Sequence, residues 1–216
     1  SELSITSAGV LTFASAPDYE TKTSYTATVT ATDGTNSTTQ SITVNVTNLN
    51  DNSPVFASPT SLSAKENQTT IGTVFATDAD GNALSYSISG TDASSVSINL
   101  SSGALTFNSA PDYETKSSYS FTATATDGAN SATQSITVNV TDVDDVAPVF
   151  TSSASLSAAE NQTAIGTVRA TDVDTDNSSI NFTVSGSEFI ITPYEGVLSF
   201  SYEPDFEVKS SFSAVI

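Results

Sequence analysis

Two stretches of strictly alternating apolar and polar residues stand out along the chain. Residues 25–31 alternate Tyr, Ala, Val and Ala with Thr, and residues 42–46 alternate Ile and Val with Thr and Asn. The same two patterns return at 119–125 and 136–140. Side chains at every second position face the same side of a strand, so this alternation predicts half-buried β-strands.

Five further short segments precede the second pair of strands, separated by Gly, Asp, Asn and Pro: Leu62–Ala64, Ile71–Thr77, Leu84–Ile88, Val96–Asn99 and Ala104–Phe107. None has helical periodicity. About seven short strands at this spacing predict an all-β fold, a seven-stranded Greek-key β-sandwich. We expect its core to contain Val74, Tyr86, Ile88, Ile98, Leu105, Phe107, Tyr119, Ile136 and Val138.

The sequence repeats itself after 94 residues. Between residues 14–47 and 108–141, 27 of 34 positions are identical without a gap. A fixed period of this length predicts tandem domains arranged end to end. We expect residues 1–53 to be the C-terminal part of one repeat, 54–147 a complete repeat, and 148–216 the N-terminal part of a third. The chain would then be a window from a longer array, with its last residues beginning a strand that matches 119–125.

The formal net charge is −19, with only five Lys and Arg residues. This balance argues against nucleic acid and anionic membranes as partners, and an acidic chain repels itself unless cations intervene. A solvated acidic surface is the alternative, but it would not need acids at fixed positions. No apolar run is long enough to insert into a membrane. Because Cys and His are absent, thiol nucleophiles and the usual general bases are missing, and we do not expect an enzyme.

The repeated positions are rich in oxygen ligands. Ca²⁺ takes six to eight oxygens from carboxylates, amides and backbone carbonyls. Glu66, the loop 112–114 and the segment 142–145 are expected at one end of the complete sandwich, where the Asp-x-Asp pair of 172–174 in the next domain meets them. The sequence therefore predicts a site for a hard divalent cation at each domain junction.

The whole pattern resembles the cadherin repeat. Five motifs occur in the family's order: Glu-Asn at 66–67, Asp-x-Asp at 78–80, Asp-Tyr-Glu at 112–114, Ala-Thr-Asp-Gly at 125–128, and an acidic linker ending in Pro-x-Phe at 142–150. The resemblance covers the full chain and implies about three Ca²⁺ ions at each complete junction. Absent cysteine and near-identical copies look most like long bacterial surface proteins that carry such repeats.

The resemblance also implies which residues bind the ions. The first junction would use Asp18, Glu20, Asn48, Asn50, Asp51, Asp78, Asp80 and Asp127, with the carbonyls of Leu49, Asn52 and Asn82. The second would use Glu66, Asp112, Glu114, Asp142, Asp144, Asp145, Asp172 and Asp174, with the carbonyls of Val143 and Val146. Glu160, Asp205 and Glu207 would serve a third junction, and Asp33 one before Ser1.

Three positions depart from the family pattern. Asn48 stands where the family usually has Asp, which removes a charge from the first junction, and Asp144 replaces an Asn, which adds one to the second. The loop 174–177 is longer than 80–82, so the carbonyl ligand there is not assigned.

These observations predict an extracellular, calcium-rigidified rod at the cell surface, the stalk of a large adhesin whose nearest partners are its own neighbouring repeats. Two alternatives stay open. The repeats themselves could bind glycans or identical molecules in adhesion or biofilm, or they could polymerise into a filament or sheath. Exposed aromatic residues typical of glycan sites would be Tyr19, Tyr113 and Phe206, but these lie in the acidic loops and are expected to pack there.

Overall fold

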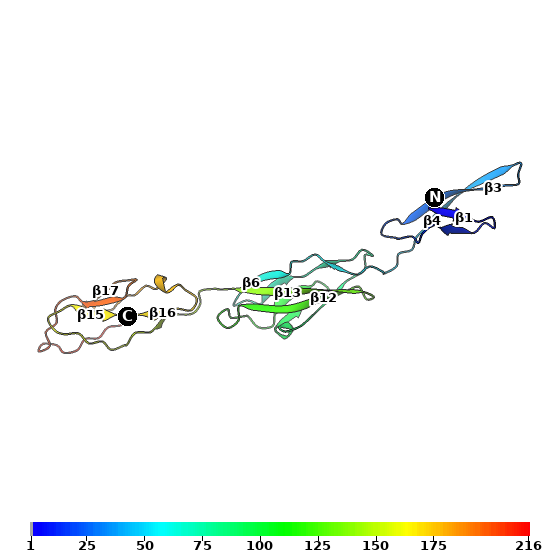
Figure 1. Cartoon of the computed structure of the whole chain (residues 1–216). Helices are drawn as coiled ribbons and strands as arrows, with labels where there is room; N and C mark the ends of the chain where they lie inside the picture. The colour runs from blue at the N-terminus through cyan, green and yellow to red at the C-terminus, as the bar shows by residue number, and fades with distance from the viewer. Residues whose placement is uncertain (1) are drawn as a thin grey trace. The chain divides into compact units, whose positions relative to one another are not determined.

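A computed structural model describes residues 2–216 (Figure 1). Within this range the regular structure consists of short β-strands and two single-turn 3₁₀ helices. Residue contacts divide the chain into two compact units, the first running to Pro111 and including Ser118–Asn139, the second comprising Asp112–Ser117 and Val140–Ile216. The all-β prediction is confirmed.

The first unit begins with two antiparallel pairs. Strands β1 (Leu3–Ile5) and β2 (Leu11–Phe13) form one, and β3 (Ser24–Thr32) and β4 (Ser37–Asn45) form the other. The β3–β4 register places Tyr25 opposite Val44 and Ala27 opposite Ile42, so the apolar positions share one face. The alternation that predicted these strands therefore also determines which side is apolar.

The centre of the first unit is a sandwich of short antiparallel strands. One sheet has the order β6-β13-β12-β9, formed by Ser61–Lys65, Ser131–Thr141, Ser118–Thr126 and Ser85–Ser89. The other has the order β10-β11-β7, formed by Val96–Ile98, Ala104–Phe107 and Thr70–Thr73. A small third pair joins β5 (Val55–Phe56) to β8 (Ala76–Thr77), and the 3₁₀ helix η1 (Ala93–Ser95) precedes β10.

The core of this sandwich comes from both sheets. Ile136 and Val138 of β13 and Leu105 of β11 are almost completely buried, as is Val74. Six of the nine expected core residues are buried: Val74, Tyr86, Leu105, Phe107, Ile136 and Val138. The other three are only partly buried: Ile88 and Ile98 lie on the edge strands β9 and β10, and Tyr119 lies near the start of β12, before its pairing with β9 begins.

One predicted strand is wrong in extent. Residues 71–77 read as a single apolar strand, but the structure divides them between β7, which pairs with β11, and β8, which pairs with β5. Phe75 lies at the division and is 48% exposed, and its carbonyl accepts hydrogen bonds from the amides of Ala57 and Ser58. The chain changes sheet here, which an apolar pattern cannot reveal.

The second unit contains β14 (Val149–Phe150) paired with β16 (Ala170–Thr171), and a sheet of order β15-β18-β17 formed by Ala164–Thr167, Val197–Phe200 and Phe189–Ile191. The helix η2 spans Asn177–Ser179. Val168, Ile180 and Phe182 form a buried cluster. The expected strand near residue 216 is absent, since residues 211–216 have no regular structure. Among the described residues, no helix is long and apolar enough to cross a membrane.

Candidate metal centres

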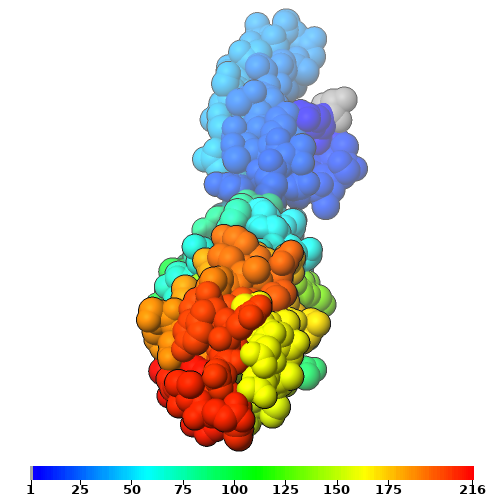
Figure 2. Space-filling model, turned by 90° about the vertical axis from the view of Figure 1, so that its left-hand side faces the viewer, coloured from blue at the N-terminus to red at the C-terminus, as the bar shows by residue number. Residues whose placement is uncertain are grey.

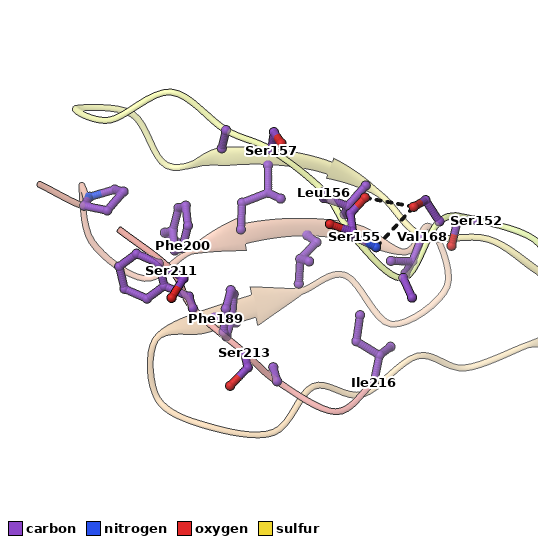
Figure 3. Close-up of a pocket in the computed structure, with 18 of the residues that line it drawn as sticks. Ser152, Ser155, Leu156, Ser157, Val168, Phe189, Phe200, Ser211, Ser213 and Ile216 are labelled. Atoms are coloured by element: carbon purple, nitrogen blue, oxygen red, sulfur yellow. Dashed lines mark hydrogen bonds between the residues drawn. The ribbon is translucent and has the colours of Figure 1, made fainter. Parts of the chain in front are cut away.

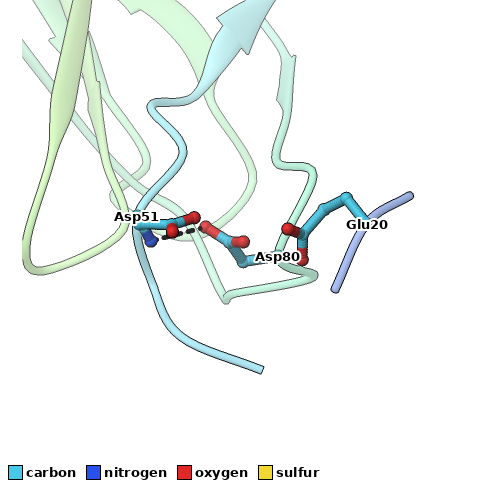
Figure 4. A group of neighbouring side chains, drawn as sticks. All are labelled: Glu20, Asp51 and Asp80. Carbon is cyan, nitrogen blue, oxygen red and sulfur yellow. Dashed lines mark hydrogen bonds between the residues drawn. The ribbon is translucent and has the colours of Figure 1, made fainter. Parts of the chain in front are cut away.

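Three predicted ligands of the first junction meet in the first unit. Glu20 follows the Pro-Asp-Tyr loop, Asp51 lies in the linker, and Asp80 lies in the loop after β8; each offers a carboxylate oxygen within 4.8 Å of the others (Figure 4). Ca²⁺ holds its oxygens at about 2.3–2.6 Å, so ligands on opposite sides of one ion lie about 5 Å apart. The spacing of these three oxygens fits a single ion.

Backbone amides hold Asp80 in place. Its Oδ2 accepts hydrogen bonds from the amides of Asp51 (3.1 Å) and Asn52 (2.8 Å), and its Oδ1 accepts one from the Asn52 side chain (2.9 Å). The hydrogen bond from the Asn52 side chain, helped by the backbone amides of Asn52 and Asp51, lowers the pKa of Asp80, and burial opposes this shift without reversing it. Burial, followed by the Asp80 carboxylate, raises the pKa of Glu20. A cation between the two groups would relieve this repulsion.

Asp78 uses only one of its two carboxylate oxygens in hydrogen bonds within the loop. Its Oδ1 accepts the amides of Asp80 (3.0 Å) and Asn82 (3.3 Å), whereas its Oδ2 is buried and has no hydrogen-bond partner. A buried carboxylate oxygen without a partner is costly, and native structures rarely keep one. A cation bound beside Oδ2 would satisfy it.

The other predicted residues of the first junction mostly serve as local anchors. Asn48 donates its side-chain amide to the carbonyl of Asp80 (2.9 Å). Asp18 accepts the amide of Glu20 and the hydroxyl of Thr21, the latter contact contributing most to its lowered pKa. The Leu49 side chain is 70% exposed and has no ligand atom, so only the Leu49 carbonyl could bind an ion. The carbonyl assigned at Asn52 accepts from Asn130 instead (3.2 Å).

Asn130 is a residue that the motifs did not indicate. Its side-chain amide donates to Asn50 Oδ1 (3.4 Å), to the Asn52 carbonyl and to Asp127 Oδ2 (3.3 Å). Asp127 in turn accepts the amides of Asn130 and Ala129, and the Asn130 amide is the largest cause of its lowered pKa. The signal in the sequence was the repeated Asp-Gly-x-Asn at 33–36 and 127–130.

We expect Asn130→Ala to loosen the linker without changing its charge. The substitution removes two hydrogen bonds between the β12–β13 turn and residues 50–52, and one within the turn, so the affinity of the first cluster for Ca²⁺ should fall several-fold. Asn36→Ala is the matched control, because Asn36 occupies the same repeat position and contacts only its own turn. Isothermal calorimetry compares the two, and equal affinities would contradict the bridging role.

The second unit builds the same kind of loop. Asp174 Oδ2 accepts the amides of Asp145 and Val146, both at 2.7 Å. A hydrogen bond with the Asp172 side chain, followed by these amides, lowers the pKa of Asp174 to about 2. Its Oδ1 is buried without a hydrogen-bond partner, as Asp78 Oδ2 is in the first unit. An ionised acid with a free buried oxygen is suited to bind a cation.

A second group of carboxylates lies at Glu160, Asp205 and Glu207, whose oxygens are within 4.8 Å of one another. Asn161 follows Glu160 with φ of 60°, a conformation that Asn tolerates better than most residues, and its amide donates to the Pro204 carbonyl (3.0 Å). This contact brings the Glu-Asn motif beside the Pro-Asp loop and explains why both motifs recur together.

The remaining predicted ligands lie in turns, loops and the linker. Glu66 is 3% exposed and precedes Asn67, which repeats the φ of Asn161 and donates to the Pro111 carbonyl (3.0 Å). Asp112 accepts the amide and hydroxyl of Thr115. Asp33 accepts the amides of residues 35 and 36, a turn contact. The other predicted ligands are exposed: Glu114 of the Asp-Tyr-Glu loop, and the linker residues Asp142, Val143, Asp144, Asp145 and Val146.

Comparison with known proteins identifies the same family that the motifs resemble. Residues 60–141 match the family model of the Cadherin domain. The repeats are cadherin-like. "Protocadherin-like wing polarity protein stan" of Drosophila melanogaster is 33% identical over 217 residues, and "Cadherin EGF LAG seven-pass G-type receptor 1" of Homo sapiens is 30% identical over 191. These alignments cover 88% and 82% of the chain but only 6% of each relative.

Solved structures give the same result for the fold. The protocadherin gammaB7 EC3-6 cis-dimer structure matches with a TM-score of 0.76 and 28% identity over 95% of this chain and 57% of that one. Mouse cadherin-23 EC22-24 matches with a TM-score of 0.68 and 25% identity over 95% and 73%. The predicted tandem cadherin-like β-sandwich is confirmed. The relatives named above are cadherins and receptors from animals, and they give no support to the bacterial-type origin.

Proposed function

We propose that this chain is a segment of an extracellular rod in which Ca²⁺ ions rigidify the junctions between cadherin-like repeats. The observation that carries the proposal is the pair of buried, unpartnered oxygens, Asp78 Oδ2 and Asp174 Oδ1, each in an Asp-x-Asp loop. The two loops correspond in the repeat, and each keeps one unsatisfied carboxylate oxygen, on the first Asp of one loop and on the second Asp of the other, which supports a bound cation rather than a general acidic surface. Each loop is already oriented by backbone amides.

Glu20, Asp51, Asp78 and Asp80 would hold an ion at the first junction, helped by Asp18 and Asn50. Asp145, Asp172 and Asp174 would hold one at the second, and repeat correspondence adds Glu66, Asp112 and Glu114. The bound ions supply positive charge that offsets the crowded carboxylates. Three ions per junction is the number that the family resemblance implies, and the domain boundaries 1–53, 54–147 and 148–216 belong to the same proposal.

The charge of the chain supports this role. A net charge of −19 with five basic residues leaves few internal partners for the acids. Lys22 pairs with Glu2 and Lys209 with Glu188, and neither of these two ion pairs involves a junction acid. The junction carboxylates therefore need an external cation to offset their mutual repulsion.

We further propose that the segment is an extender of a larger cell-surface adhesion protein. Near-identical copies lengthen a spacer by duplication, which suits this role. Binding of glycans or of identical molecules by the repeats is the alternative. Tyr19 and Tyr113 are half-buried in their loops, whereas Phe206 is 61% exposed and does not pack as expected. Glycan-array binding by the full chain in calcium would favour the alternative.

We expect Asp174→Asn to weaken Ca²⁺ binding by the second unit by about ten-fold or more, since a charged ligand with a desolvated oxygen is lost. The amide is nearly isosteric, so the fold should persist without calcium. Glu195→Gln is the control: Glu195 is an exposed acid in the same unit, in the turn between β17 and β18. Calcium titration followed by thermal unfolding measures both, and equal shifts would mean that general acidity, not a site, binds the ion.

A further inference from the structure

Strand β17 forms one edge of the sheet β15-β18-β17 in the second unit. Within the described part of the chain it pairs only with β18, and Figure 2 shows the orange segment to which it belongs at the surface of this unit. On either side of β17, the Glu188 carbonyl and the Thr192 amide bond to the segment 197–201 that contains β18 (2.8 and 3.0 Å). Because successive residues of a strand direct their backbone groups to opposite sides, those of Phe189 and Ile191 face away from the sheet.

The side chains of β17 are apolar on both faces. Phe189 turns inward and stacks on Phe200 with ring centroids 5.5 Å apart (Figure 3), and Ile191 lies on the same face, opposite Leu198. Ile190 points to the other face and is 55% exposed. The exposed side of this edge is therefore apolar as well.

The central repeat has a polar residue at the same place. In its sheet β10-β11-β7, the edge strand is β10, and the register makes Ser97 the counterpart of Ile190 and Ala104 the counterpart of Val197. Val197 is 43% exposed beside Ile190. A sheet with one face in water normally alternates apolar and polar residues, so the exchange of Ser97 for Ile190 marks this edge as different.

The central repeat also blocks its edge with a turn of the backbone. The helix η1 directly precedes β10, and the Val96 amide, which would otherwise face outward, donates to the Ala93 carbonyl. Asp92 ties this turn to β12: its amide donates to the Ser120 carbonyl (3.1 Å), and its Oδ2 accepts from the Ser120 amide (2.8 Å). The edge of β10 is thus partly covered.

The second unit has no room for such a turn. Five residues, 91–95, separate Gly90 from Val96 in the central repeat, but only two, 187–188, separate the corresponding Gly186 from Phe189. Phe189 therefore keeps an outward amide where Val96 does not. Native sheets protect their edges with charges, proline, bulges or covering segments. Of these devices β17 has none, and only its shortness limits what can pair with it.

We propose that β17 pairs antiparallel with β17 of a second copy of this chain. A two-fold axis through the Ile190 pair places Phe189 of each copy opposite Ile191 of the other, and their outward amides and carbonyls bond to each other. The two Ile190 residues form a non-hydrogen-bonded pair, whose Cα atoms lie about 4.5 Å apart and whose side chains touch. This inference goes beyond the calcium rod, because it depends on backbone pairing rather than on ions.

The charges at this edge allow two acidic chains to meet. Glu188 accepts hydrogen bonds from Lys209 Nζ (2.7 and 2.8 Å) and from the Tyr202 hydroxyl (3.0 Å), so its charge is offset. Antiparallel pairing places Glu188 opposite Thr192 of the second copy. The two Glu188 residues are then about 14 Å apart along the strands, beyond the screening length of about 8 Å at physiological ionic strength. A second copy can therefore approach here despite the net charge of −19.

The dimer should be weak and closed. Two strands of three residues are too short to bury the roughly 1,200 Å² of a standard interface. The two-fold axis uses both edges, so association stops at two copies. Sedimentation velocity of the 216-residue chain in calcium should show monomer and dimer whose proportion follows protein concentration. A chain that is wholly monomeric at about 1 mM, or that grows beyond the dimer, would overturn the proposal.

The two edges offer a matched pair of substitutions. Ile190→Lys brings two like charges together at the axis and should weaken association by about ten-fold or more. The side chain points outward, so the pairing with β18 and the interior are kept. Ser97→Lys adds the same charge at the same position of the blocked edge and should leave association unchanged. Association that resists Ile190→Lys would assign the contact to another surface.

A covalent trap tests the register and does not depend on strong association. The chain has no cysteine, and a Cα separation of about 4.5 Å lies within the range that a disulfide spans. Ile190→Cys should therefore give a disulfide-linked dimer when oxygen and copper oxidise the two thiols. Ser97→Cys, at an exposed position of the central repeat, should stay monomeric. No covalent dimer from Ile190→Cys, or equal amounts from both variants, would contradict the proposed pairing.

Discussion

Removal of calcium should lower the thermal unfolding temperature of this chain by about 3–11 °C per occupied site. Extracellular calcium modules bind at about 10⁻⁴–10⁻³ M, so calcium at ten to one hundred times the dissociation constant stabilises by about 1.4–2.7 kcal/mol per site. For a chain of this length, each kcal/mol corresponds to about 2–4 °C. The two Asp-x-Asp loops contribute separately, because they belong to different units.

Differential scanning calorimetry in calcium, and in EDTA at the same ionic strength, measures this change. Magnesium in EGTA is the control, because Mg²⁺ demands a smaller octahedral site and keeps its waters. Small-angle scattering of the same samples reports the linkers, whose repelling carboxylates should loosen without calcium. Identical melting curves and scattering profiles in calcium and EDTA would defeat the calcium-rod proposal.

The alternation of apolar residues was enough to predict β3, β4, β12 and β13. In these strands successive side chains point to opposite faces of the sheet. The order of apolar and polar residues along the sequence therefore fixes which residues share a face. The division of residues 71–77 was missed, because Phe75 and its neighbours are uniformly apolar while their hydrogen-bond partners lie in two different sheets. The pattern of apolar residues in a segment predicts burial, but its strand pairing depends on residues that are distant in the sequence.

The strand expected near Ile216 shows the same dependence. Residues 212–216 have the pattern of the start of β12, but a strand needs a neighbour, and no strand among the described residues pairs with them. In the central repeat, the nine-residue register between β12 and β13 supplies that neighbour. Local propensity therefore did not suffice where the cross-strand partner was missing.

The acidic motifs predicted several candidate ligands that the structure brings together. Glu20, Asp51 and Asp80 come from segments up to 60 residues apart, and only the repeat pattern connected them. Asn130 was missed because an amide in a turn is ordinary in sequence and becomes informative only through its three contacts. Calcium binding by these residues stays a prediction that the calorimetry above decides.

Gly103→Ala should be the most damaging small substitution in the central sandwich, lowering the free energy of unfolding by about 4 kcal/mol or more. Gly103 has φ of +70°, and a Cβ there would overlap the carbonyl oxygen of Val74, a residue that is completely buried. Two backbone hydrogen bonds keep Val74 and Gly103 from moving apart. The Val74 amide donates to the Gly103 carbonyl (3.0 Å), and the Gly103 amide donates to the Asn99 carbonyl (2.9 Å).

Gly128→Ala is the matched control for this substitution. Gly128 also has a positive φ, +97°, in the turn between β12 and β13, but a Cβ there has no atom within 4 Å. Its cost is backbone strain alone, about 1–2 kcal/mol. Denaturant unfolding in EDTA, which removes any calcium contribution, separates strain from overlap. Equal losses for the two variants would show that positive φ, and not the close approach of Val74, requires glycine at 103. Gly196 has the same relation to Val168 in the second unit, so Gly196→Ala should repeat the larger effect there.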